Sequence, residues 1–232
     1  MILNANDIFK NAFVVSIDNV RLLEFQKNFK NKNIPLPKIF TGYEIEDSYL
    51  LAYTNAFDTL KKEKKDGLLN LDLRLFHSFF NNASHFAIVQ FAKILDLPFV
   101  TIFEDDAVPV DDCIEKLNLY CSDIPDKIDV LRIGYCSQFY RPTRECDIKI
   151  AIPHSDNLIV KNLSGSHAYI VFKRYYDDFI KTNKVNPRCD FSKINPSIYK
   201  NVFALKESLF NQINLKNRPV IHSYKLDDLI TK

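Results

Sequence analysis

Three adjacent carboxylates, Glu104, Asp105 and Asp106, follow an apolar run over residues 99–103. The run predicts a buried β-strand, and three acids at its end need a counter-charge. Because side chains alternate along an extended backbone, we expect Glu104 and Asp106 on one side, roughly 6 to 7 Å apart, with Asp105 opposite. Hard oxygen ligands favour Mg²⁺ or Mn²⁺, which commonly link protein carboxylates to substrate phosphates. The triplet therefore predicts a divalent metal site for a nucleotide diphosphate.

The alternative for these acids is structural, with the triplet capping the following helix. Asp112 and Glu115 already stand in capping-box spacing at the start of a helix predicted over 112–120, so the triplet is not needed there. The four glycines form neither a dinucleotide-binding pattern nor a P-loop pattern. A bound diphosphate must then be held by a metal and by basic side chains, because no glycine-rich loop can cradle it.

The elements that must position the acids alternate along the chain. Strands are predicted at 13–17, 39–41, 99–103, 129–133 and 167–172, a hairpin at 148–152 and 157–161, and helices at 20–29, 48–62, 78–95, 112–120 and 175–182. The C-terminal part is predicted to be rich in loops. The alternation indicates an α/β layer fold, in which ligands lie beyond the carboxyl ends of strands, and Glu104 to Asp106 lie at such an end. With neither a repeat nor a linker in the sequence, residues 1–232 are expected to form a single domain.

Composition narrows the class of protein. The chain is 47% hydrophobic and 26% charged with a net charge of +2, which does not indicate nucleic-acid binding. Five cysteines without a CxxC pair predict reduced thiols. The absence of an apolar signal core, or of a run of ~20 apolar residues, predicts a cytoplasmic protein. The lysine cluster at 61–65 is expected to be solvated, with a peripheral contact to an anionic membrane as the alternative.

Several motifs, in order along the chain, resemble those of the family 25 glycosyltransferases, which include bacterial lipooligosaccharide galactosyltransferases. Ser84-His85 followed by Phe103-Glu104-Asp105-Asp106-Ala107 resembles the "SH … LEDD" core of that family. The other similar segments are residues 14–18 with Arg21, residues 165–169 (Gly-Ser-His-Ala-Tyr), and Asp190 with residues 209–212 (Leu-Phe-Asn-Gln). Residues 78–83 depart from the family, which has a Gly-Glu-x-Gly-Cys run there.

The resemblance implies a GT-A-type fold, a nucleotide-sugar-binding mixed sheet flanked by helices. It implies inverting transfer of a hexose, with galactose the expected sugar, from a UDP-sugar donor to a glycan or glycolipid acceptor. The setting implied is lipopolysaccharide or lipooligosaccharide biosynthesis, in the cytoplasm or at the cytoplasmic face of the inner membrane. No residue pattern assigns an oligomeric state.

The resemblance also implies residue roles at the metal and the reacting atoms. Glu104 and Asp106 would hold Mn²⁺ or Mg²⁺, and Asp105 would contact the ribose or sugar of the donor. His222 is the candidate third ligand, unless its segment is only a terminal strand. Asp190 is the candidate catalytic base that takes the acceptor's proton, and the alternative is an ordinary loop acid.

Three further residues have two interpretations each. Arg21 would pair with phosphate or stack on uracil, and otherwise it is a surface helix arginine. His167 faces the sugar site or is a strand histidine bonded to backbone. His85 lies in an apolar helix, where a hydrogen-bonded core histidine supporting the site is favoured over a ligand.

Two other functions use similar residues. A metal-dependent phosphohydrolase or nucleotidyltransferase would need the same acids, but it would turn over nucleotide sugars without a glycan acceptor. A non-catalytic glycan-binding protein on the same fold would keep its binding after Asp106→Ala.

Overall fold

The computed structural model describes residues 2–16, 19–40, 73–136, 152–153, 158–160, 164–182 and 201–212. The helices are α1 (Ala5–Lys10), α2 (Asn19–Asn31), α4 (Leu73–Ile94), α5 (Cys113–Tyr120) and α6 (Tyr176–Thr182), and a 3-10 turn covers Lys173–Tyr175. The strands are β1 (Ala12–Val15), β2 (Lys38–Phe40), β3 (Phe99–Glu104), β4 (Ala107–Pro109), β5 (Val130–Cys136), β6 (Ile152–Pro153), β7 (Leu158–Val160), β8 (Ser164–Phe172), β9 (Val202–Leu205) and β10 (Phe210–Gln212).

The strands in these residues form one mixed sheet in the order β2-β1-β3-β8-β5-β9-β7-β6. β2, β1 and β3 are parallel, whereas β8 runs antiparallel between β3 and β5. β10 lies off this path, parallel to β5 and antiparallel to β4. This arrangement confirms the prediction of an α/β fold with a mixed sheet.

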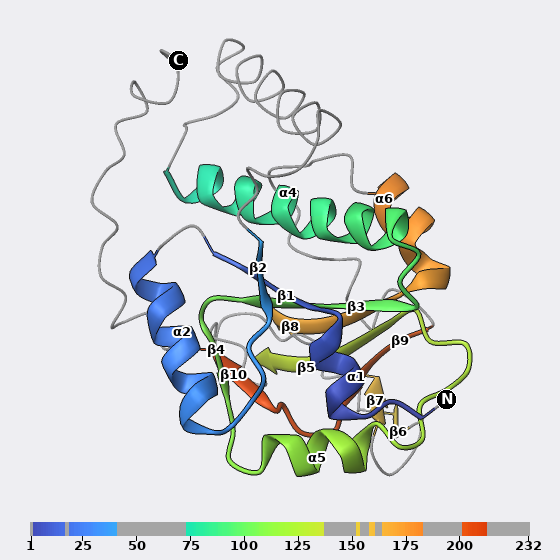
Figure 1. Ribbon diagram of the computed structural model, residues 1–232. Helices are drawn as coiled ribbons and strands as arrows, with labels where there is room; N and C mark the ends of the chain where they lie inside the picture. The colour runs from blue at the N-terminus through green and yellow to red at the C-terminus, as the bar shows by residue number, and fades with distance from the viewer. Residues whose placement is uncertain are drawn as a thin grey trace, which may run out of the picture.

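Helices cover both faces of the sheet, with α4 and α6 on one side and α1, α2 and α5 on the other (Figure 1). The alternation of β3 divides its side chains between the two cores. Phe99 and Phe103 belong to the core that includes residues of α1 and α2, while Val100 and Ile102 belong to the core that includes residues of α4 and α6. Because β3 is buried on both faces, its sequence over residues 99–103 is a nearly continuous apolar run.

Aromatic packing fixes the end of β3. The ring of Phe103 lies 4.9 Å from that of Phe210 and 5.5 Å from that of Phe29, both in edge-on geometry, and 6.0 Å from the stacked ring of Phe9. Offset and edge-on pairs are the favoured arrangements of aromatic rings. Because Phe103 directly precedes Glu104, these contacts from α1, α2 and β10 position the first acid of the triplet.

Most predicted elements in the described residues are present with shifted bounds. The hairpin is confirmed by the antiparallel pairing of Ile152 with Val160 in β6 and β7. The prediction of a loop-rich C-terminal part is wrong for β9 and β10, which form by pairing with distant strands. Helix α1 and strand β4 were not predicted. The predicted helix at 48–62 lies outside the described residues.

The expected capping box does not form. Asp112 adopts a left-handed conformation with φ of 54° and makes no side-chain hydrogen bond to the start of α5. An N-cap side chain reaches the first turn from an extended backbone, and the left-handed backbone does not provide that geometry. None of the helices in the described ranges is both long enough and apolar enough to span a membrane.

Candidate functional site

The acidic triplet lies where three segments from distant parts of the sequence meet. β3 ends at Glu104, Asp105 and Asp106 form a turn, and β4 follows. β1 lies parallel to β3 with Val15 opposite Glu104, so that Ser16 reaches the same edge of the sheet. β10 pairs with β4 and sets Gln212 opposite Ala107. The carboxyl ends of β1 and β3 and the end of β10 therefore surround the turn.

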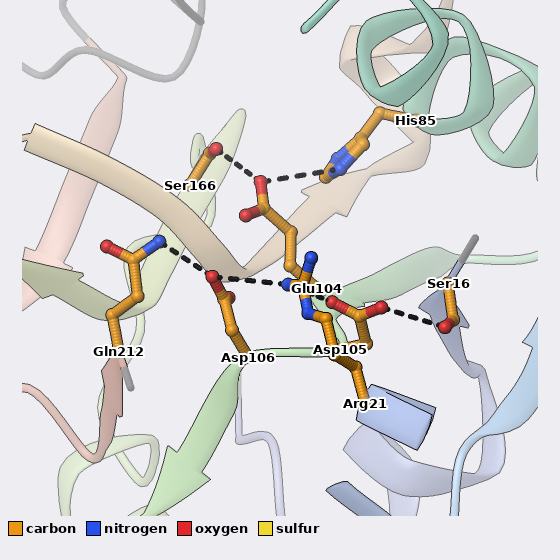
Figure 2. Close-up of polar contacts among 8 residues, drawn as sticks. All are labelled: Ser16, Arg21, His85, Glu104, Asp105, Asp106, Ser166 and Gln212. Atoms are coloured by element: carbon orange, nitrogen blue, oxygen red, sulfur yellow. Dashed lines mark hydrogen bonds and ion pairs between the residues drawn. The ribbon is translucent and has the colours of Figure 1, made fainter. Parts of the chain in front are cut away.

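Asp105 and Asp106 share contacts with one arginine, as Figure 2 shows. Arg21 Nη2 forms an ion pair with Asp105 Oδ1 and lies 3.5 Å from Asp106 Oδ2. Ser16 Oγ donates a hydrogen bond to Asp105 Oδ2 at 2.8 Å, and Gln212 Nε2 donates one to Asp106 Oδ2 at 3.0 Å. The two carboxylates are 5% and 4% exposed, whereas the arginine side chain is 20% exposed. The arginine side chain is thus more exposed to solvent than the acids it contacts.

Glu104 has different partners, which come from α4 and β8 (Figure 2). Ser166 Oγ donates a hydrogen bond to Glu104 Oε1 at 2.6 Å, and His85 Nε2 lies 3.6 Å from the same oxygen. The other ring nitrogen of His85, Nδ1, is 2.7 Å from the Tyr169 hydroxyl, and the two rings are stacked. Glu104 is therefore linked to the core through neutral and aromatic side chains.

Burial shifts the pKa values of Asp105 and His85 in opposite directions, because it favours the neutral form of each group. Burial raises the pKa of Asp105 to about 6, against the lowering effects of Arg21 and of the hydrogen bond from Ser16. Burial lowers the pKa of His85 to about 3, against the raising effect of Asp106. His85 is consequently neutral near pH 7, and it serves as a hydrogen-bonding core residue next to Glu104.

The predicted alternation of the three acids assumed an extended backbone throughout, whereas Asp105 and Asp106 form a turn. The strand stops at Glu104, and the turn at Asp105 and Asp106 lets a single nitrogen of Arg21 contact both aspartates. Asp105 is therefore grouped with Asp106 around Arg21. In the structure Arg21 contacts this pair of carboxylates. The sequence had suggested either a contact with phosphate or uracil or a surface helix arginine, and neither interpretation included the carboxylates.

His167 lies inside the sheet and is fully buried. Its Nε2 donates a hydrogen bond to the Phe210 carbonyl at 2.7 Å, which is the backbone-bonded arrangement of the two that the sequence allowed. Burial lowers its pKa. In the structure His167 helps to hold β10 against β8. Because Gln212 lies on β10, this hydrogen bond also helps to position Gln212.

A close backbone approach at Gly134 of β5 also positions β10. A Cβ at residue 134 would lie 2.8 Å from the Cβ atoms of both Ala168 and Phe210, which is shorter than side chains tolerate. Glycine therefore allows β10 to approach β5 and β8 closely enough for Gln212 to reach Asp106. This role has no signal in the sequence, because the clash involves residues far from Gly134 along the chain.

The structure brings Arg21, Glu104, Asp105 and Asp106 together, while Asp190 and His222 lie outside the described residues. Sequence reasoning missed Ser16 as a partner of the site, although its position directly after an apolar strand was a usable signal. Ser166, Tyr169 and Gln212 belonged to the motifs of the resemblance, but no role was assigned to them.

The donor set is suited to a hard cation. The three acids offer carboxylate oxygens, the ligand type that Mg²⁺ and Mn²⁺ prefer. The part of the chain that the structure describes contains no group of three His, Cys, Asp or Glu side chains already placed to hold a metal. Arg21 contacts the carboxylates Asp105 and Asp106 instead, so a cation that binds there must share or replace its contacts.

Comparison with protein-family models gives no match to this chain. Comparison with curated proteins gives no significant match.

Proposed function

We propose that this chain is an inverting, metal-dependent glycosyltransferase of GT-A type, which moves a hexose from a UDP-sugar to a glycan or glycolipid acceptor. One observation carries the proposal. The segments that resemble the family 25 enzymes are spread over the sequence, yet their side chains contact the same acidic turn: Arg21 contacts Asp105 and Asp106, His85 and Ser166 lie against Glu104, and Gln212 bonds to Asp106. This convergence on one site supports the proposal.

The residues of the turn fit the binding of a nucleotide diphosphate. Asp106 and Glu104 would hold the metal, and Asp105 would remain oriented by Ser16. When bound, Mn²⁺ or Mg²⁺ acts as a Lewis acid that stabilises the negative charge on the leaving diphosphate. Arg21 is partly exposed beside the acids and can add a charge-assisted hydrogen bond to phosphate. Asp190 is the proposed base that accepts the acceptor's hydroxyl proton.

The neutral His85 supports this arrangement from the core. With its pKa lowered to about 3, it adds no positive charge that would compete with the metal for Glu104. Its hydrogen bond with Tyr169 fixes the ring, and Ser166 fixes one oxygen of Glu104. Glu104, held in this way, needs little rearrangement when a metal binds. We further propose galactose as the sugar and lipopolysaccharide or lipooligosaccharide assembly as the setting.

The proposal is tested by ligand-observed NMR with UDP-galactose, UDP-glucose and UDP-N-acetylglucosamine, with and without Mn²⁺. We expect at least one UDP-sugar to bind, and to bind more weakly after chelation of the metal. Equal binding with and without metal would contradict the metal site. Product analysis with and without lipooligosaccharide core oligosaccharides then separates the reactions, because a transferase needs the acceptor and a phosphohydrolase does not.

A further inference from the structure

Arg21 supplies the positive charge beside Asp105 and Asp106 in the structure. A single nitrogen, Nη2, contacts one oxygen of each carboxylate (Figure 2). The acids are almost fully buried, while the arginine side chain is partly exposed. A cation that binds Asp106 therefore has to share or replace its contact with the guanidinium.

Breaking the ion pair is unfavourable as long as no ligand is bound. Removing the partner of a buried charge is destabilising, because the remaining charge is left desolvated and uncompensated. Two buried aspartates in contact with one guanidinium are such a case. A free divalent ion must compete with that interaction, and its apparent affinity for the turn is lowered accordingly.

A diphosphate changes this balance. Arginine is well suited to bind phosphate oxygens, because its planar fork donates two parallel hydrogen bonds. When the diphosphate arrives together with the metal, Arg21 can exchange carboxylate oxygens for phosphate oxygens. The metal, held by Glu104 and Asp106, would then supply the positive charge beside the buried acids, and Asp105 would keep its hydrogen bond from Ser16.

On the basis of the proposed function, we propose that Arg21 is a resident counter-ion of the acidic turn that opposes binding of the free divalent metal and favours its binding together with a nucleotide diphosphate. Coupling between two ligands is reciprocal, so UDP should tighten Mn²⁺ binding by the same factor as Mn²⁺ tightens UDP binding. Arg21 adds to the coupling that the metal itself provides, and it is also a specificity-determining residue for the diphosphate.

The test is titration calorimetry of Mn²⁺ into the full chain, with and without UDP, for wild type and Arg21→Gln. We expect Arg21→Gln to bind Mn²⁺ alone about tenfold more tightly than wild type, and to show a smaller tightening by UDP than wild type. Arg21→Lys keeps the charge without the fork and should lie between the two. Lys27→Gln is the matched control, since Lys27 is an exposed cation on the same helix, and it should behave as wild type.

The outcomes separate this inference from the proposed function. If Mn²⁺ and UDP bind to wild type but Arg21→Gln does not tighten Mn²⁺ alone, the counter-ion role is wrong and the proposed function stands. If wild type binds neither Mn²⁺ nor UDP, singly or together, both are wrong. If Arg21→Gln is unfolded without metal, Mn²⁺ should restore its folding, as followed by circular dichroism, and failure to do so overturns the role of Arg21.

Discussion

The two sides of the acidic turn are held by different kinds of interaction. On one side, Glu104 contacts Ser166 and the neutral His85, which is fully buried and bonded to Tyr169. On the other, Asp105 and Asp106 meet the charged and partly exposed Arg21. Neutral contacts inside the core have no alternative partner in solvent, whereas an ion pair near the surface can exchange with another ion. Adjacent acids can therefore be given a fixed role and an exchangeable role by their neighbours alone.

The largest expected effect is the loss of folding stability at low pH that the buried His85, next to Glu104, should cause. The pKa of His85 is about 3 in the folded protein and 6.5 in the unfolded chain, so the unfolded state binds the proton first. The associated stability is present above pH 6.5 and is lost as the pH falls towards 3, by up to about 5 kcal/mol. His85→Phe keeps a ring and removes this effect. Urea unfolding in EDTA between pH 7 and 4 should show a smaller loss of stability for the variant, and equal losses would contradict a buried neutral His85.

On the Asp106 side, we expect the largest effect on activity. Asp106→Asn removes a charge while keeping the shape and the hydrogen bond from Gln212 feasible, so the fold should persist. Loss of electrostatic stabilisation at the leaving group should lower kcat/KM for sugar transfer by about 1,000-fold, or about 4 kcal/mol.

Asp111→Asn is the matched control for Asp106→Asn. Its carboxylate is 90% exposed and pairs with Lys32, so this variant should retain transfer activity. Full activity of Asp106→Asn would remove Asp106 from the metal and diphosphate site.

Asp105 should respond to protons in the sense opposite to His85. Its pKa is 3.8 in the unfolded chain and about 6 in the folded protein, so the folded state binds the proton more tightly. The resulting stability is present below pH 3.8 and is lost as the pH rises through 6, by up to about 3 kcal/mol. The stability of Asp105→Asn relative to wild type should therefore increase between pH 4 and 8. A flat difference in urea unfolding would show that Arg21 and Ser16 fully offset the burial of this acid.

The smallest effect concerns the hydrogen bond behind His85. Tyr169→Phe removes the hydroxyl that lies 2.7 Å from His85 Nδ1 and should lower the free energy of unfolding by about 1 kcal/mol. Tyr120→Phe removes a hydroxyl that donates to Glu207 in a less buried setting, and its expected effect is smaller. Equal losses of stability in urea unfolding would show that the hydrogen bond between His85 and Tyr169 contributes no more than the one between Tyr120 and Glu207.

Much of the frame of the site could be predicted from the sequence. The strand at 99–103, the first strand and the following helix all depend on apolar periodicity, which is a local property. β9 and β10 could not be predicted in this way. β10 has three residues, and it exists because Phe210, Asn211 and Gln212 pair with β4.

The sequence by itself determined that three acids stand at the end of a buried strand, because the apolar run and its abrupt end are encoded in neighbouring residues. Only the tertiary structure decided which partners each acid has. Gln212 and Asp106 are 106 residues apart, and Ser16 and Asp105 are 89 apart. Contacts over such separations depend on strand order and on close approaches such as that at Gly134, which local patterns do not encode.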